Sequence, residues 1–162
     1  MIRAFSGESI DDGALKRILN AGRRAGSSKN LQRWRFIVVR DKERLRALSE
    51  VGPFAQHIGG AAVAVALVTP DPRAPDAPLS VIFDVGRAAQ NMVLAAWDLG
   101  IGSAPATVYE HERARSLLGY PNEYHCEYLL SFGYPADPSE LTVPKRRGGR
   151  NPLAEVVHYE HW

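Results

Sequence analysis

The sequence lacks the features that define several large classes of protein. Cys126 is its single cysteine, so no disulfide can form within the chain. No apolar run is long enough to span a bilayer, and the first ten residues have no apolar core of the kind found in secretion signals. The formal net charge is only +2, so bulk charge does not indicate nucleic acid or a membrane surface as a partner. We therefore expect a cytoplasmic protein.

Nucleotide-binding signatures are also missing. The chain has no Gly-x-Gly-x-x-Gly turn and no phosphate-binding P-loop, so a Rossmann-type nicotinamide site is not indicated. The five histidines show no metal-ligand spacing and have no cysteine partners, so we expect no metal site. Cys126 lies near an apolar strand and is expected to be a core residue. The three tryptophans are expected to anchor the core or an interface.

The chain is long enough to form one folded domain over residues 1–162. Its 162 residues are 45% hydrophobic and 23% charged, as in ordinary globular proteins. Ser9 is the expected cap of the first helix. We expect loops over residues 69–79, which hold four prolines, and from Gly100 to Thr107. Apolar periodicity predicts helices over residues 9–24, 41–50, 80–99 and 110–118, and strands over 35–40, 61–68 and 127–134.

The segment from Ser80 to Leu99 is apolar around nearly the whole circumference of its predicted helix. A helix of this kind is buried on all sides. A chain of this length has little interior in which to bury it, so a subunit interface would complete the burial. We therefore expect an obligate homodimer with this helix at its centre.

Four segments, in order along the chain, resemble the FMN-dependent nitroreductase family. They are Arg3-Ala4-Phe5; Gly26 to Trp34 (GSSKNLQRW) with the FIVV strand after it; Asp84-x-Gly86 with the helix and turn through Ser103; and Phe132-Gly133-Tyr134-Pro135 with the basic loop and the segment from Arg150 to His158. Together they span almost the whole chain. The resemblance implies an α+β fold in which helices flank a central, mainly antiparallel sheet, in an intertwined homodimer.

The resemblance also implies a flavin enzyme. FMN would be held between two subunits, and NAD(P)H would reduce it. Nitroaromatics, quinones or similar small electrophiles would then accept the electrons in a ping-pong reaction. The flavin carries this chemistry, so no catalytic acid or base of the protein is expected.

The residues expected to bind the cofactor are short polar groups, one backbone stretch and basic side chains. Ser27, Ser28 and Asn30 would meet the flavin of the other subunit, residues 105–107 would lie against its ring, and the arginines would hold the phosphate. The full set is Arg3, Ser27, Ser28, Asn30, Gln32, Pro105, Ala106, Thr107, Lys145, Arg147 and Arg150.

Each assignment has a structural alternative. The polar loop could be only a helix C-cap and turn, because serine and asparagine favour such positions. Arg3 could be a solvated terminal residue, and the KRRGGR run a solvated loop or a weak nucleic-acid patch. Residues 105–107 could be an ordinary loop leading to an edge strand.

Two positions depart from the family pattern. The Arg-Arg-Ser element that precedes the equivalent of Arg3 is missing, so either the start of the chain is truncated, or FMN binding is weaker, or it is lost. Arg33 stands where the family has proline; it either favours an anionic substrate or points to solvent. The rival functions are a non-enzymatic binding or flavin-storage dimer, flavin destruction and reductive dehalogenation, with residues 69–79 as the candidate substrate segment.

Overall fold

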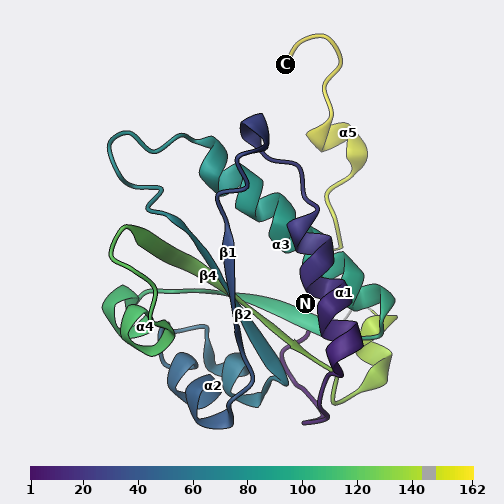
Figure 1. Ribbon diagram of the computed structural model, residues 1–162. Coiled ribbons are helices and arrows are strands. Elements are labelled where there is room, and N and C mark those ends of the chain that lie inside the picture. Colours follow the sequence, from purple (N-terminus) through teal and green to yellow (C-terminus); the bar gives the residue numbers. More distant parts are fainter. Residues whose placement is uncertain (144–148) are drawn as a thin grey trace.

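A four-stranded antiparallel sheet forms the centre of the molecule. Figure 1 shows the computed structural model, which describes residues 1–143 and 149–162. The strand order is β1-β2-β4-β3, so β1 and β3 are the edges. The strands are β1 (Arg35–Val39), β2 (Val63–Pro70), β3 (Gly102–Thr107) and β4 (Tyr124–Gly133).

Helices cover both faces of this sheet, as the α+β expectation requires. Helices α1 and α3 lie on one face, and α2 and α4 on the other (Figure 1). Among the described residues, no helix is long and apolar enough to cross a membrane. The helices are α1 (Asp12–Arg23), α2 (Lys42–Leu48), α3 (Ser80–Asp98), α4 (His111–Leu118) and α5 (Leu153–Val156), with short 3-10 turns η1 (Ser28–Asn30), η2 (Gln56–Gly60) and η3 (Pro138–Leu141).

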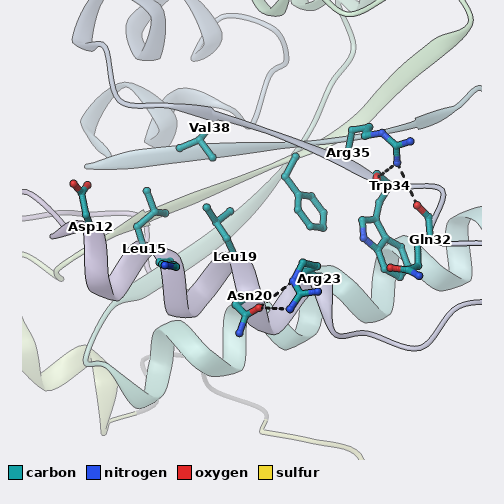
Figure 2. A pocket seen from close by; sticks show the side chains of 11 residues that line it. Asp12, Leu15, Leu19, Asn20, Arg23, Gln32, Trp34, Arg35 and Val38 are labelled. Atoms are coloured by element: carbon teal, nitrogen blue, oxygen red, sulfur yellow. Dashed lines mark hydrogen bonds between the residues drawn. The ribbon is translucent and has the colours of Figure 1, made fainter. Parts of the chain in front are cut away.

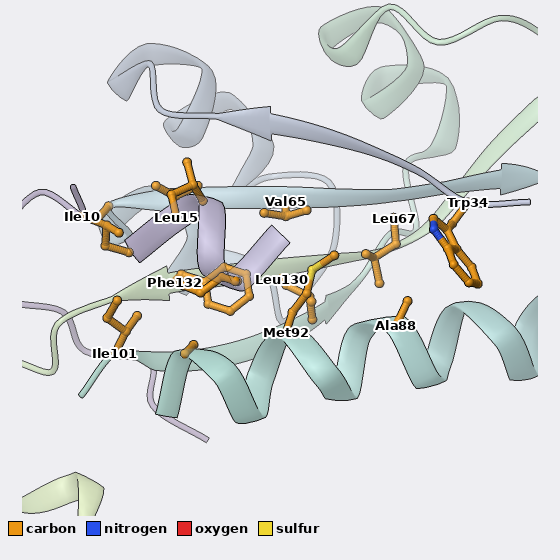
Figure 3. Close-up of a cluster of buried hydrophobic side chains, with 14 of the residues drawn as sticks. Ile10, Leu15, Trp34, Val65, Leu67, Ala88, Met92, Ile101, Leu130 and Phe132 are labelled. Atoms are coloured by element: carbon orange, nitrogen blue, oxygen red, sulfur yellow. The ribbon is translucent and has the colours of Figure 1, made fainter. Parts of the chain in front are cut away.

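The core between the sheet and the α1–α3 pair is closely packed. Ile18, Met92 and Phe132 are fully buried there, and Trp34 closes one end of the cluster (Figure 3). A Cβ atom at Gly22 would lie 2.2 Å from the Met92 side chain, so glycine allows α1 to approach α3 this closely. This packing fixes the position of the loop that follows α1.

Several residue-level expectations are met and others are not. Cys126 is fully buried in the second core, under α2 and α4, as predicted. Trp34 is buried as predicted, whereas Trp97 and Trp162 are exposed in the single chain. The cap of α1 is Asp11 and not Ser9, because the Asp11 carboxylate accepts a hydrogen bond from the Ala14 N–H at 2.9 Å.

The expected loop from Gly100 to Thr107 is wrong, because residues 102–107 form β3. Glycine and proline made this segment resemble a loop, but it pairs with β4 in regular antiparallel register from Gly102↔Gly133 to Thr107↔Tyr128. Pro105 is compatible with this strand because β3 is an edge, where one side of the backbone needs no ladder hydrogen bond. β2 continues two residues beyond the expected end at Val68, and β4 begins three residues before the expected start at Glu127.

Helix α3 is not buried on all sides within one chain. Phe83, Leu94 and Trp97 fall on one stripe at helical spacing, and each is exposed; Phe83 has 66% of its surface accessible. Ile82 on a neighbouring stripe is also exposed. Among residues 1–143 and 149–162, nothing therefore covers this apolar face of α3.

Candidate functional site

The loop after α1 has an unusual backbone. Lys29, Asn30 and Gln32 have φ values of +51°, +56° and +46°. Residues other than glycine rarely adopt this left-handed region, and each instance costs of order 1–3 kcal/mol. Three in four residues indicate that the loop is held in a specific shape, and such strain is concentrated at functional sites.

A small hydrogen-bond network holds this shape. The carboxylate of Asp84 on α3 accepts from the Ser28 N–H at 2.9 Å, and the Ser27 hydroxyl oxygen accepts from the Gln32 N–H at 3.0 Å. The Gln32 side-chain amide donates to the Asn30 side-chain oxygen at 3.0 Å. Four of the predicted site residues, Ser27, Ser28, Asn30 and Gln32, are thus brought together. The buried Asp84, which sequence reasoning did not assign to the site, anchors them.

The end of the loop is fixed by the core. Trp34 is 6% exposed, and its ring stacks against that of Phe36 at a centroid distance of 6.5 Å. Arg33 is partly buried. The aromatic anchor and the Asp84 hydrogen bond hold the loop at both of its ends.

Residues 105–107, the backbone stretch predicted to lie against the flavin ring, belong to the free edge of the sheet. The Ile2 N–H donates to the Ser103 oxygen, away from β4, whereas the Val108 N–H donates to the Glu127 oxygen on β4. Strand alternation therefore directs the backbone groups of Pro105 and Thr107 away from β4. Pro105 has no N–H, so of residues 105–107 only Thr107 presents an N–H at this edge.

An apolar slot lies between this edge and α3. Its cavity volume is about 130 Å³, and Ile82, Gly86, Ala89, Pro105 and Tyr128 are among its lining residues. A Cβ atom at Gly86 would meet no atom within 4 Å, so the slot is open above this glycine. A flat apolar group could lie against it.

Arg3 lies near the same edge of the sheet. The Ile2 N–H is 3.0 Å from the Ser103 oxygen, and the Ile2 side chain fills the space left by the missing side chain of Gly102. This pairing fixes the neighbouring Arg3, which is exposed. Arg3 and Pro105 thus lie in the same region of the folded structure, at the free edge of β3.

His57 is a buried neighbour of both residues that the sequence did not indicate as part of the site. Burial lowers its pKa, as does the nearby charge of Arg3, while the neighbouring Pro105 backbone acts in the opposite direction. Its Nδ1–H donates to the Ser131 hydroxyl at 2.9 Å, and that hydroxyl donates to the Ala104 oxygen. Among the described residues, Nε2 has no hydrogen-bond partner.

Arg150, the one described residue among the predicted C-terminal basic residues, is not joined to this site. Arg150 is exposed, and no hydrogen bond between described residues links it to the loop or to β3. Lys145 and Arg147 lie outside the described residues, so their predicted role stays a prediction.

The polar loop and the apolar slot lie on opposite faces of α3. The loop attaches at Asp84, whereas the slot is formed at Ile82, Gly86 and Ala89. At 100° per residue, these two sets are turned by about half a revolution from each other. One chain therefore cannot place its own loop over its own slot.

A larger groove runs along the other edge of the sheet. It has a volume of about 670 Å³ and lies between α1 and β1 (Figure 2). Leu15, Leu19, Phe36 and Val38 supply apolar walls, and Arg23 lies at one end beside Gln32 and Trp34. Because β1 is an edge strand, the backbone N–H and C=O groups that do not pair with β2 point toward this groove.

The C-terminal segment leaves the body of the molecule. It carries α5 and extends beyond α1 and α3 (Figure 1). Leu153, Val156, Tyr159 and Trp162 are all exposed on it, and Trp162 is almost fully accessible. No described part of the chain covers these apolar side chains.

Comparison with known proteins places this architecture in one family. The nitroreductase family model matches residues 1–59 and 49–134. A protein of Archaeoglobus fulgidus, provisionally named NADH dehydrogenase/NAD(P)H nitroreductase, is 37% identical over 99% of this chain and 92% of its own length. A Methanothermobacter thermautotrophicus protein of the same provisional name is 30% identical over 99% of this chain and 82% of its own length.

Solved structures agree with this assignment. The FMN-dependent nitroreductase from Clostridium difficile superposes with a TM-score of 0.83 at 26% identity, covering 99% of this chain and 94% of that one. The chain belongs to the nitroreductase family.

Proposed function

We propose that residues 1–162 form one FMN-binding domain of a homodimeric, FMN-dependent NAD(P)H oxidoreductase. The observation that carries this proposal is the separation of a strained polar loop and an open apolar slot onto opposite faces of α3. Two half-sites on one helix require a second copy to complete each of them.

A dimer that packs α3 against α3 satisfies this requirement. The exposed stripe of Phe83, Leu94 and Trp97 lies between the two half-sites and would be buried. The Ser27–Gln32 loop of one subunit would then lie beside the slot of the other.

The residues of these half-sites fit FMN. The slot of Gly86, Ala89 and Pro105 would take the apolar face of the isoalloxazine ring, and the loop would offer amides and hydroxyls to its polar edge and ribityl chain. Arg3 and Arg150 supply exposed guanidinium groups suited to a phosphate. Lys145 and Arg147, a few positions before Arg150 in the sequence, would add positive charge for the phosphate.

The protein's part in the reaction is binding and orientation. FMN, when bound, supplies the redox chemistry, accepting a hydride from NAD(P)H and passing electrons to a nitroaromatic, quinone or similar electrophile. The Thr107 N–H at the free edge of β3 would donate a hydrogen bond to the ring and favour its reduced, electron-rich state. The apolar slot would exclude water from the ring. Use of reduced nicotinamide would place the protein in the cytoplasm.

The groove along β1 supports an intertwined form of this dimer. Its apolar walls match the exposed apolar residues of the C-terminal segment, which would cross to a second copy and lie beside the β1 edge. This exchange would cover Leu153, Val156 and Tyr159. It would also bring the tail toward Gln32 and Arg23 of the other subunit.

Absorbance of the purified protein tests the proposal directly. We expect a yellow protein whose released chromophore is FMN, present at one molecule per chain, and bleached by NADH or NADPH without oxygen. Bound FMN that neither nicotinamide bleaches would favour the storage protein. A chain that takes up no FMN would refute the proposal.

A further inference from the structure

A cluster of metal-ligating side chains lies away from the proposed flavin site. His111 begins α4, and His125 and Glu127 lie near the start of β4, against which α4 packs (Figure 1). One ligand atom from each of the three side chains lies within 4.8 Å of the other two. The two imidazole rings are in contact, with a centroid distance of 4.5 Å.

The cluster is built into the fold. His125 is only 2% exposed, and its Nε2–H donates to the Glu127 carboxylate at 2.7 Å. The β2–β4 register passes from Leu67↔Tyr128 to Val68↔Cys126, which leaves Glu127 as the extra residue of a β-bulge. Bulges turn a side chain out of the regular alternation, and this one holds the carboxylate beside His125.

One polar atom of the cluster is left unsatisfied. His111 Nδ1 is buried and has no hydrogen-bond partner among the described residues. Burying an imidazole nitrogen without a partner costs free energy, and a bound ligand would recover it.

We propose that His111, His125 and Glu127 bind a divalent transition-metal ion such as zinc. Two imidazole nitrogens and one carboxylate form a ligand set typical of open zinc sites, in which water takes the fourth position. Tetrahedral ligands at about 2.0–2.1 Å from zinc are about 3.4 Å apart. His111 would therefore move slightly closer to the other two ligands, while His125 Nε2 and the Glu127 carboxylate, now 2.7 Å apart, would separate slightly. Cys126, between His125 and Glu127 in sequence, is not counted among the ligands, because its side chain is fully buried in the second core and its thiol donates to the Tyr128 backbone oxygen at 3.4 Å.

The positively charged side chain of Arg73 would compete with a metal ion for His125. Its guanidinium donates to His125 Nδ1 at 2.9 Å and also pairs with Asp71. When Nε2 binds a metal, Nδ1 carries the proton and needs an acceptor, so Arg73 must withdraw. Arg73 lies on the exposed segment between β2 and α3, where this movement disturbs no core contact.

The spacing of the histidines did not indicate this cluster. A helix and a turn separate His111 from His125, and the bulge that positions Glu127 depends on pairing with β2. Only the folded chain brings the three ligands together.

Zinc titration of the chelator-treated protein, followed by calorimetry, tests the site. We expect one zinc ion per chain and a rise in Tm with added zinc. His111→Ala and Glu127→Gln should each weaken binding at least tenfold, whereas His158→Ala on the exposed tail should not change it. Arg73→Gln should strengthen binding several-fold, because glutamine removes the positive charge and offers an acceptor to the His125 Nδ1–H.

Two variants are expected to weaken zinc binding and one to strengthen it. The test therefore stays decisive even if one variant folds poorly. Absence of saturable zinc uptake would overturn the proposal. So would uptake that is unchanged in both the His111 and Glu127 variants, or weakened by Arg73→Gln.

Discussion

The Asp84 carboxylate accepts a hydrogen bond from the Ser28 N–H across 56 positions of sequence, at 2.9 Å. Asp84 is 6% exposed, so this bond joins the N-terminal part of α3 to the strained loop without competition from bulk water. The loop keeps three left-handed residues beside this anchor. The shape of the proposed flavin-contacting loop therefore depends on α3, the helix that we place at the dimer interface.

Removing this anchor should loosen the loop and weaken FMN binding. Asp84→Ala leaves the Ser28 N–H without its acceptor, and we expect FMN affinity to fall about tenfold, or about 1.4 kcal/mol. Asp84→Asn keeps an oxygen acceptor and should lose much less. Fluorescence titration of both variants with FMN measures the difference, and equal affinities for the two would show that the hydrogen bond does not shape the site.

The phosphate assignment can be tested at the two described arginines of the predicted set. Arg3→Ala and Arg150→Ala should each weaken FMN binding by about 1.5–3 kcal/mol, the value of a charge-assisted hydrogen bond. Arg44→Ala, on the exposed side of α2, is the matched control and should leave affinity unchanged. Unaltered affinity in the Arg150 variant would exclude that arginine from the phosphate site.

The exposed stripe of α3 should be the centre of the dimer. Leu94→Arg places a charge on this stripe, where a dimer would bury it without a partner, and we expect a monomer that has lost FMN. Leu94 is exposed in the single chain, so the fold itself should survive. Phe54→Arg changes an equally exposed apolar residue outside α3 and should remain dimeric in light scattering. A dimeric Leu94 variant would contradict this interface.

Local patterns carried much of the prediction. The resemblance of residues 26–34 to the family's motif identified the 27–32 loop, and the apolar circumference of residues 80–99 identified the helix that the described residues leave partly uncovered. Both are encoded in short stretches of sequence. The left-handed backbone of Lys29, Asn30 and Gln32 was not visible, because it depends on the Asp84 anchor.

Two of the failures, at β3 and at His57, share one physical cause, which is long-range pairing. Gly102 and Pro105 make the β3 segment resemble a loop, and only its register with β4 makes it a strand. His57 was missed for the same reason, because its neighbours Ser131 on β4 and Pro105 on β3 are distant from it in the sequence. Single-sequence patterns contain no signal for such contacts.

His57 should make stability depend on pH. Burial, and then the charge of Arg3, lower the pKa of its imidazole in the folded chain below the unfolded value of 6.5. Below pH 6.5 the unfolded chain therefore binds a proton that the folded chain resists, so stability is lost as the pH falls and is regained above that value. We expect the Tm to decrease between pH 7.5 and pH 5.5, and His57→Gln to reduce this decrease, because a glutamine can hydrogen-bond Ser131 but does not titrate. Arg3→Ala should reduce it more weakly, since the Arg3 charge is the smaller cause. An identical pH dependence in the His57 variant and the parent would assign the effect to another group.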